Sequence, residues 1–303
     1  MNSASPLPLV SVIIPSFRHE LFIANCLESI VAQTYPAIEV ILIDDASPDR
    51  SLDVANAVLT KYSSRFERIV VLTNIVNRGA HFSLNRGLSV AHGAYISFIN
   101  SDDEYDRDRL HVMIDAMEKR GSGFGFSAVE TIDEASAPTY RETLSFDLRY
   151  RPLLLEHRMP SLSWGFLSGQ LTASTGNIVV SRVLADKVGE FADLKYCHDW
   201  DYTLRAVFFA EPIMVHEPLY RYRLHGSNSF RNLTEAAAAE SEYVLSNYFR
   251  RVMTATPVNH LAPAPQNWPG MFMDLLELTE ARPFFERLYQ PYRDCHRTVA
   301  CGV

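Results

Sequence analysis

The sequence predicts an α/β fold in which helices cover both faces of a mainly parallel sheet. Three strand-like runs are almost entirely apolar, VSVIIP (10–15), IEVILIDD (38–45) and AYISFIN (94–100), and helix-like segments separate them. Strands of this kind need cover on both faces, which is typical of parallel sheets with helical crossovers. Two of these runs also lead into adjacent aspartates, and ligands bind beyond the carboxyl ends of such strands.

The spacing of apolar residues predicts each element in order along the chain. Helical spacing across 19–35 predicts the first helix, which Pro36 follows. The next expected elements are a helix at about 50–62, a strand at 68–74, helices across 83–93 and 107–121, and a strand at 124–130. Residues 131–170 contain three prolines and are expected to be loop-rich. Later elements are ordered structure at 175–182, a helix at 199–210, strands at 213–217 and 220–224, and helical structure from 233 onward.

Composition restricts the class of protein. The 303 residues, 47% of them hydrophobic, are enough for a sizeable core, and the net charge of −8 argues against non-specific binding to nucleic acid. Four cysteines without CxxC spacing fit a reduced compartment. The start of the chain does not resemble a secretory signal, and no apolar stretch approaches the roughly 20 residues that cross a bilayer. We therefore expect a cytoplasmic protein.

Asp102 and Asp103 follow the apolar run at 94–100, with only Ser101 between them and the run. Adjacent carboxylates repel each other and resist burial, so something at this strand end should compensate them. Ser101-Asp102-Asp103 has the character of a motif that binds a metal–diphosphate, for which Mg²⁺ or Mn²⁺ would suit the oxygen ligands. The alternative is that Asp102 caps the following helix and Asp103 is a solvated turn residue.

Two further stretches contain candidate functional groups. HDWDYTLR (198–205) places Asp199 and Asp201 in the first turn of a helix, where acidic side chains suit the helix dipole. The two carboxylates point to different faces, so one can act as a general base while the other caps the helix. His225 is either a surface histidine or a metal ligand, and Arg221 and Arg223 beside it offer positive charge for a diphosphate.

Taken together, these motifs resemble the family 2 inverting glycosyltransferases, which have the GT-A fold. The resemblance covers about residues 9–230, in the order VSVIIPSF, VILIDDAS, NRGAHFSLNRGLSVAHGAYISFINSDDEY, TGNIVVSR, HDWDYTLR and YRLHG. It implies a catalytic domain at 1–232, with a nucleotide-binding half at about 9–130 and an acceptor half at about 131–232. Residues 233–303 would form a helical C-terminal extension.

The resemblance also implies which residues hold the nucleotide sugar. They are Pro15, Ser16, Phe17, Asp45, Arg78, Asp102 and Asp103. Asp45 matches a carboxylate beside the base, and Asp102 matches the residue that contacts the ribose. Asp103 matches the ligand of a Mn²⁺ or Mg²⁺ ion, to which His225 is a frequent additional ligand. Arg78 is included because Leu84 stands where an arginine is usual.

On the acceptor side, Asp199 matches the catalytic base, and Asn177 and Asp201 are expected to lie near the acceptor. The family often has an acidic residue before the base, and here that residue is His198. No QxxRW sequence follows, which favours transfer of a single sugar over processive synthesis.

The implied function is metal-dependent, inverting transfer of one sugar from a nucleotide-diphosphate sugar, with UDP preferred. The acceptor would be a saccharide or lipid-linked saccharide in cell-surface polysaccharide or glycoconjugate synthesis. Two alternatives are a catalytically silent relative that binds a nucleotide sugar and a sugar nucleotidyltransferase. The aromatic and arginine residues of 282–297 leave a peripheral membrane contact open, and a homodimer is open as well.

Overall fold

Eight strands form one sheet in the computed structural model, which describes residues 7–140, 142–226 and 235–278. The strands are β1 (Val10–Ser16), β2 (Ile38–Asp44), β3 (Arg68–Thr73), β4 (Tyr95–Phe98), β5 (Glu104–Tyr105), β6 (Phe124–Ile132), β7 (Val179–Ser181) and β8 (Ile213–Arg223). Their order across the sheet is β3-β2-β1-β4-β7-β6-β8-β5. Strands β1 to β4 pair in parallel, and β6 pairs in parallel with β8. Strand β7 is antiparallel to its neighbours β4 and β6, and β5 is antiparallel to β8. The mainly parallel α/β sheet expected from the sequence is confirmed.

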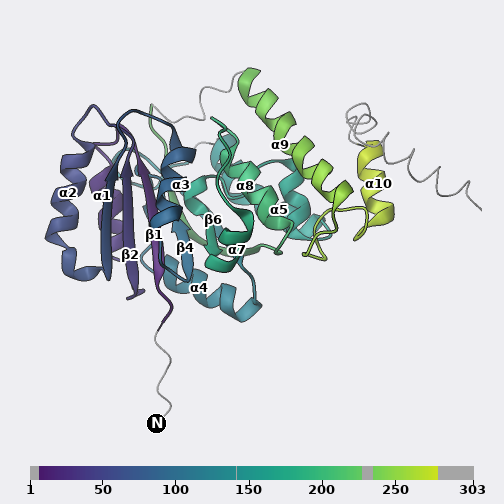
Figure 1. Cartoon of the computed structure of the whole chain (residues 1–303), viewed down its shortest axis with the longest axis horizontal. Helices are drawn as coiled ribbons and strands as arrows, with labels where there is room; N and C mark the ends of the chain where they lie inside the picture. Colours follow the sequence, from purple (N-terminus) through teal and green to yellow (C-terminus); the bar gives the residue numbers. More distant parts are fainter. Residues whose placement is uncertain (1–6, 141, 227–234, 279–303) are drawn as a thin grey trace, which may run out of the picture.

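Helices cover both faces of this sheet (Figure 1). They are α1 (Ile23–Val31), α2 (Ser51–Lys61), α3 (Ala80–Val90), α4 (Arg109–Arg120), α5 (Glu142–Arg158), α6 (Leu162–Gly165), α7 (Arg182–Val188), α8 (His198–Val207), α9 (Glu235–Thr254) and α10 (Pro269–Leu278). Val12 and Ile14 of β1 pack with α1, α2 and α4, whereas Ile13 packs in the cluster that contains α3, α7, α8 and α9. Because neighbouring residues of a strand point to opposite faces, one strand contributes to both clusters.

Helix α5 contradicts the expectation that 131–170 is loop-rich. It runs from Glu142 to Arg158 with Pro152 inside it. Leu153 and Leu155 pack against the larger core cluster. Packing of this kind stabilises a helix that the proline disfavours locally, which is why the sequence pattern was misleading.

The two strands expected at 213–217 and 220–224 are one strand, β8. Its register against β6 shifts where Ala128 is paired with Pro218. A proline cannot donate to the ladder, and an irregularity of this kind accommodates it without ending the strand. The separate strands expected from the sequence are therefore replaced by one bulged strand.

The described part of the C-terminal region contains the helices α9 and α10, and turns and irregular structure connect them at 255–268. Phe272 of α10 belongs to the same core cluster as Ile13 of β1, so this region packs on the central core. Among the described residues, no helix has the length and apolar character needed to cross a bilayer. The segment 282–297, expected to be a possible membrane contact, lies outside the described residues. The division into two halves and an extension stays a prediction.

Candidate functional site

The carboxyl ends of β1, β2 and β4 lie at one edge of the sheet. Parallel pairing sets Ser16 opposite Asp44, and the loop after β1 joins the loop after β2 through a hydrogen bond from the Asp45 N–H to the Ser16 carbonyl, 2.8 Å long. Pro15 and Phe17 are half-buried and Ser16 is buried at this edge. Both aspartate pairs of the sequence, Asp44-Asp45 and Asp102-Asp103, therefore follow strands that end on the same side.

Asp102 lies between two histidines from distant parts of the chain. His225 Nε2 is 2.9 Å from Asp102 Oδ2, and His19 Nε2 is 3.8 Å from the same oxygen. Burial raises the pKa of Asp102, but the hydrogen bond from His225 and the electrostatic interactions with both histidines outweigh it, so the pKa lies below its ordinary value. His19 Nδ1 is also 2.7 Å from Ser101 Oγ, which orients the ring.

These three side chains form a candidate metal centre. Their ligand atoms all lie within 4.8 Å of one another. A donor set of two imidazole nitrogens and one carboxylate oxygen fits Mn²⁺ better than Mg²⁺, because Mg²⁺ prefers oxygen ligands. The sequence did not single out His19, although it stands three residues beyond Ser16, where β1 ends. That position at the carboxyl edge was the available signal.

Asp103, the metal ligand expected from the sequence, has different partners. The Tyr220 hydroxyl donates to Asp103 Oδ2, and the Arg223 N–H donates to Oδ1 at 2.8 Å. Burial and the charge of Asp102 raise the pKa of Asp103 well above its ordinary value. The structure therefore brings His225 to Asp102, while Asp103 joins the loop after β4 to β8.

Arg221 and Arg223 do not offer free charge to a diphosphate, as the sequence suggested. Arg221 Nη1 lies 2.6 Å from Glu104 Oε2, and Arg223 Nη2 forms an ion pair with the same carboxylate. Arg223 is fully buried, and its Nε donates to the Asp102 carbonyl at 2.7 Å. These arginines hold the loop that carries Asp102, and Glu104 compensates their charge.

Asp45 organises the loop that leads into α3. Its carboxylate accepts hydrogen bonds from the Asn74 side chain at 2.6 Å and from the N–H groups of Arg78 and Gly79 at 2.9 and 2.8 Å. Gly79 has φ 88°, in the region that favours glycine. The Arg78 side chain is exposed and lies 3.9 Å over the ring of Phe82. Both carboxylate oxygens of Asp45 already accept hydrogen bonds within the protein. Contact of this carboxylate with a base stays a prediction.

Asp199 lies in the first turn of α8, as expected. Its side chain is half-buried, and Oδ1 accepts the N–H of Trp200 at 2.7 Å. Burial raises the pKa of Tyr222, and the charges of Asp103, Asp102 and Asp199 raise it further. All three carboxylates therefore act electrostatically on the same tyrosine, Tyr222.

The other acceptor-side residues lie elsewhere. Asn177 is fully buried, and its amide donates to the carbonyls of Ser127 and Thr172. Any effect of Asn177 on an acceptor must therefore be indirect. Asp201 lies on another face of α8 and pairs with Arg205 at 2.8 Å. His198 Nε2 lies 3.2 Å from Thr175 Oγ1, and burial lowers the pKa of this histidine.

Comparison with known proteins defines the class to which this fold and site belong. The profile described as "Glycosyl transferase family 2" matches residues 11–169. The chain belongs to this family.

Several proteins with glycosyltransferase names are similar to the chain. EpsH of Bacillus subtilis (strain 168) is 30% identical over 235 residues, which cover 73% of this chain and 62% of EpsH. TuaG of the same organism is 32% identical over 145 residues, or 46% of this chain and 56% of TuaG. The chain thus matches little more than half of the length of these relatives.

Solved structures support the fold. S. aureus TarS 1-349 has a TM-score of 0.60 at 17% identity, covering 92% of this chain and 78% of TarS 1-349. Mannosyltransferase PcManGT from Pyrobaculum calidifontis, in complex with GDP-Man and Mn²⁺, has a TM-score of 0.58 at 16% identity, covering 95% of this chain and 82% of that one. At these identities the likeness concerns the fold.

Proposed function

We propose that the protein is a metal-dependent, inverting glycosyltransferase that moves one sugar from a nucleotide-diphosphate sugar to an acceptor hydroxyl. The observation that carries this proposal is the cluster of His19, Asp102 and His225 at the carboxyl edge of the sheet. Family membership supports it, as do the similar folds of TarS in complex with UDP-GlcNAc and of PcManGT with GDP-Man and Mn²⁺.

His19, Asp102 and His225 are the residues that would hold the metal ion. Such an ion, when bound, supplies positive charge that stabilises a departing diphosphate. The exposed Arg78 guanidinium, at the end of the loop fixed by Asp45, is placed to add further positive charge at this edge. Pro15, Ser16 and Phe17 would line the nucleotide side of the same edge.

Asp199 is the proposed general base. Its carboxylate takes the proton of the acceptor hydroxyl while that oxygen attacks the anomeric carbon. The bond between this carbon and the diphosphate oxygen breaks, and the diphosphate leaves from the opposite side, so the anomeric configuration inverts. We expect Asp199→Asn to lower kcat by about 10²–10⁴-fold, the range of general base catalysis, without weakening nucleotide binding.

UDP is the preferred nucleotide, because TarS, which has a similar fold, has been crystallised with UDP and UDP-GlcNAc. A saccharide of the cell surface is the proposed acceptor. TuaG is named for teichuronic acid biosynthesis, which supports this class of acceptor.

Calorimetric titration of UDP, GDP and dTDP tests the donor site. Each nucleotide is titrated with Mn²⁺, with Mg²⁺ and in EDTA, against the wild type, Asp102→Asn and His19→Ala. His111→Ala is the control, because this histidine is exposed on α4. One nucleotide should bind with Mn²⁺, and both site variants should lose that binding. Equal affinity in EDTA would refute metal dependence, and no binding to folded protein would refute the donor site. An NMR spectrum of the product that shows retained anomeric configuration would refute the base mechanism.

A further inference from the structure

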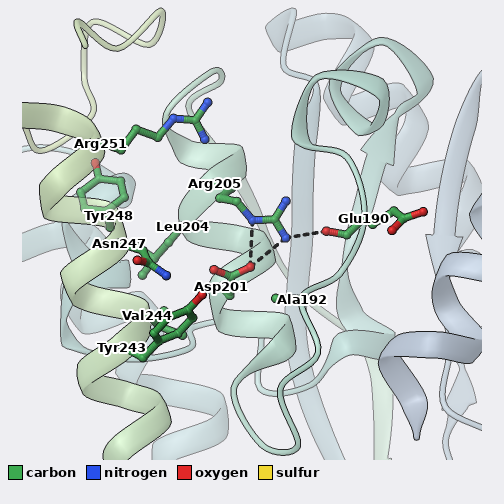
Figure 2. Close-up of a pocket in the computed structure, with 10 residues that line it drawn as sticks. All are labelled: Glu190, Ala192, Asp201, Leu204, Arg205, Tyr243, Val244, Asn247, Tyr248 and Arg251. Carbon is green, nitrogen blue, oxygen red and sulfur yellow. Dashed lines mark hydrogen bonds and ion pairs between the residues drawn. The ribbon is translucent and has the colours of Figure 1, made fainter. Parts of the chain in front are cut away.

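A pocket of about 330 Å³ lies between α8, α9 and the loop before α8 (Figure 2). It lies on the face of α8 that carries Asp201 and Arg205, and α9 contributes Tyr243, Asn247 and Arg251 to the opposite wall. The pocket is distinct from the cluster around Asp102, and of the site residues named above only Asp201 lines it.

The pocket contains two arginines, Arg205 and Arg251, together with the acidic residues Glu190 and Asp201. Arg205 forms an ion pair with Asp201 at 2.8 Å, so these two charges compensate each other. Glu190 contributes its backbone carbonyl, which accepts from Arg205 Nη2 at 2.7 Å, while its carboxylate points away from Arg205 (Figure 2). The charge of Arg251 is left without a balancing carboxylate on the pocket wall.

Arg251 is held in place but has donors to spare. Its guanidinium lies 4.1 Å over the ring of Phe208 and 4.7 Å over that of Phe209. Within residues 7–140, 142–226 and 235–278, this guanidinium makes no hydrogen bond or ion pair. Burial and the charge of Arg205 lower the pKa of Arg251, so an anion bound beside it would relieve an unfavourable position. A guanidinium matches the shape of carboxylate and phosphate groups.

The remaining wall suits a sugar ring. Tyr243 is 53% exposed and presents an aromatic surface on which the apolar face of a pyranose can pack. Asn247 offers an amide, which can donate to and accept from hydroxyl groups. Aromatic, amide and paired charged groups together are the chemistry that recognises a carbohydrate bearing an acidic group.

We propose that this pocket is a saccharide-binding subsite that takes an anionic sugar unit of the acceptor. The proposal rests on the proposed glycosyl transfer and names its acceptor class. Asp201 and Arg205 lie roughly 3 and 9 Å further along the axis of α8 than Asp199, at about 1.5 Å per residue. Because Asp201 lies on another face of α8 than Asp199, an acceptor would need several sugar units, passing around the helix, to reach both the proposed base and the pocket, and the proposal therefore favours chains over single sugars.

Calorimetric titration of defined saccharides tests the pocket. The probes are a hyaluronan tetrasaccharide, which carries carboxylates, glucose 6-phosphate, neutral chitotetraose and inorganic phosphate. We expect one of the two anionic saccharides to bind at least about tenfold more tightly than chitotetraose, since a charge-assisted hydrogen bond contributes about that factor. Which of the two binds identifies the acidic group. Binding of inorganic phosphate alone, or equal affinity for the neutral chain, would overturn the proposal.

Variants locate the binding. Arg251→Gln should weaken binding of the anionic saccharide by at least about tenfold. Arg120→Gln removes a charge from the exposed end of α4 and should leave this affinity unchanged. Tyr243→Ala changes an exposed ring, so it should preserve the fold and still weaken binding. Unchanged saccharide affinity in both pocket variants would refute the assignment.

Titration of UDP with Mn²⁺ on the same samples separates this proposal from the proposed function. Intact nucleotide binding without saccharide binding would overturn the pocket alone. Absence of UDP binding by the wild type would overturn the donor site on which the pocket proposal rests.

Discussion

Glu240 of α9 holds the segment that leads into α8, and its replacement tests how the C-terminal region supports the site. Glu240 Oε1 accepts the N–H of Lys195 at 2.9 Å, and Oε2 accepts those of Tyr196 and Cys197 at 2.8 and 3.0 Å. Helix α8 begins at His198, directly after these residues. Glu240→Gln keeps the size of the side chain but replaces one accepting oxygen with an NH₂ group that faces N–H donors.

The structure allows an estimate of the cost. A hydrogen bond to a charged group contributes about 1.5–3 kcal/mol, and loss of one partner leaves the others poorly satisfied. Because Glu240 is half-exposed, water replaces part of what is lost. We therefore expect Glu240→Gln to lower the free energy of unfolding by about 1–2 kcal/mol at pH 7.

The effect should depend on pH. Partial burial raises the pKa of Glu240, but the three backbone donors outweigh it and leave the pKa below its ordinary value. A depressed pKa contributes stability above the unfolded value of about 4.3, and this contribution is lost as pH falls through the folded pKa. The difference between wild type and Glu240→Gln should therefore shrink below about pH 4.

Urea denaturation followed by circular dichroism, at pH 7 and at acidic pH, measures this difference. Glu242→Gln is the matched control, because Glu242 is exposed on the same helix. Glycosyl transfer by Glu240→Gln should show a lower kcat with little change in nucleotide affinity, since the start of α8 carries Asp199. Equal stability of the two variants at pH 7, or a difference that does not change with pH, would refute the reasoning.

Two further substitutions test the carboxyl edge of the sheet. In Gly176→Ala, the new Cβ would lie 2.0 Å from the Tyr220 hydroxyl oxygen, so this ring must move away from Asp103. We expect the free energy of unfolding, measured by thermal unfolding, to fall by about 1–3 kcal/mol, and we expect weaker nucleotide binding. Gly226→Ala, whose added Cβ has no atom of the described residues within 4 Å, should be neutral, and equal effects of the two would contradict this account. Asp45→Asn should destabilise the loop before α3 by about 1–3 kcal/mol, measured by urea denaturation, and the argument fails if the exposed Asp53→Asn is as harmful.

The sequence alone was sufficient to predict the sheet and most of its helices. Apolar strands alternating with helical spacing require burial on both faces, and this local pattern survives in the fold because packing and pattern agree. The sequence also predicts that Asp102 and Asp103 lie at the end of a strand and Asp199 at the start of a helix, because such ends can be predicted from neighbouring residues.

Only the tertiary structure decided which of these residues meet. Asp102 and His225 are 123 positions apart in the chain, and their contact depends on the pairing of β5 with β8. That pairing brings His225 to Asp102 and leaves Asp103 to Tyr220, a choice that two adjacent aspartates do not reveal. Helix α5 forms around Pro152 for the same reason, because contacts between distant segments outweigh a local preference. Residue spacing encodes local structure, whereas a site built from several loops depends on how the whole chain packs.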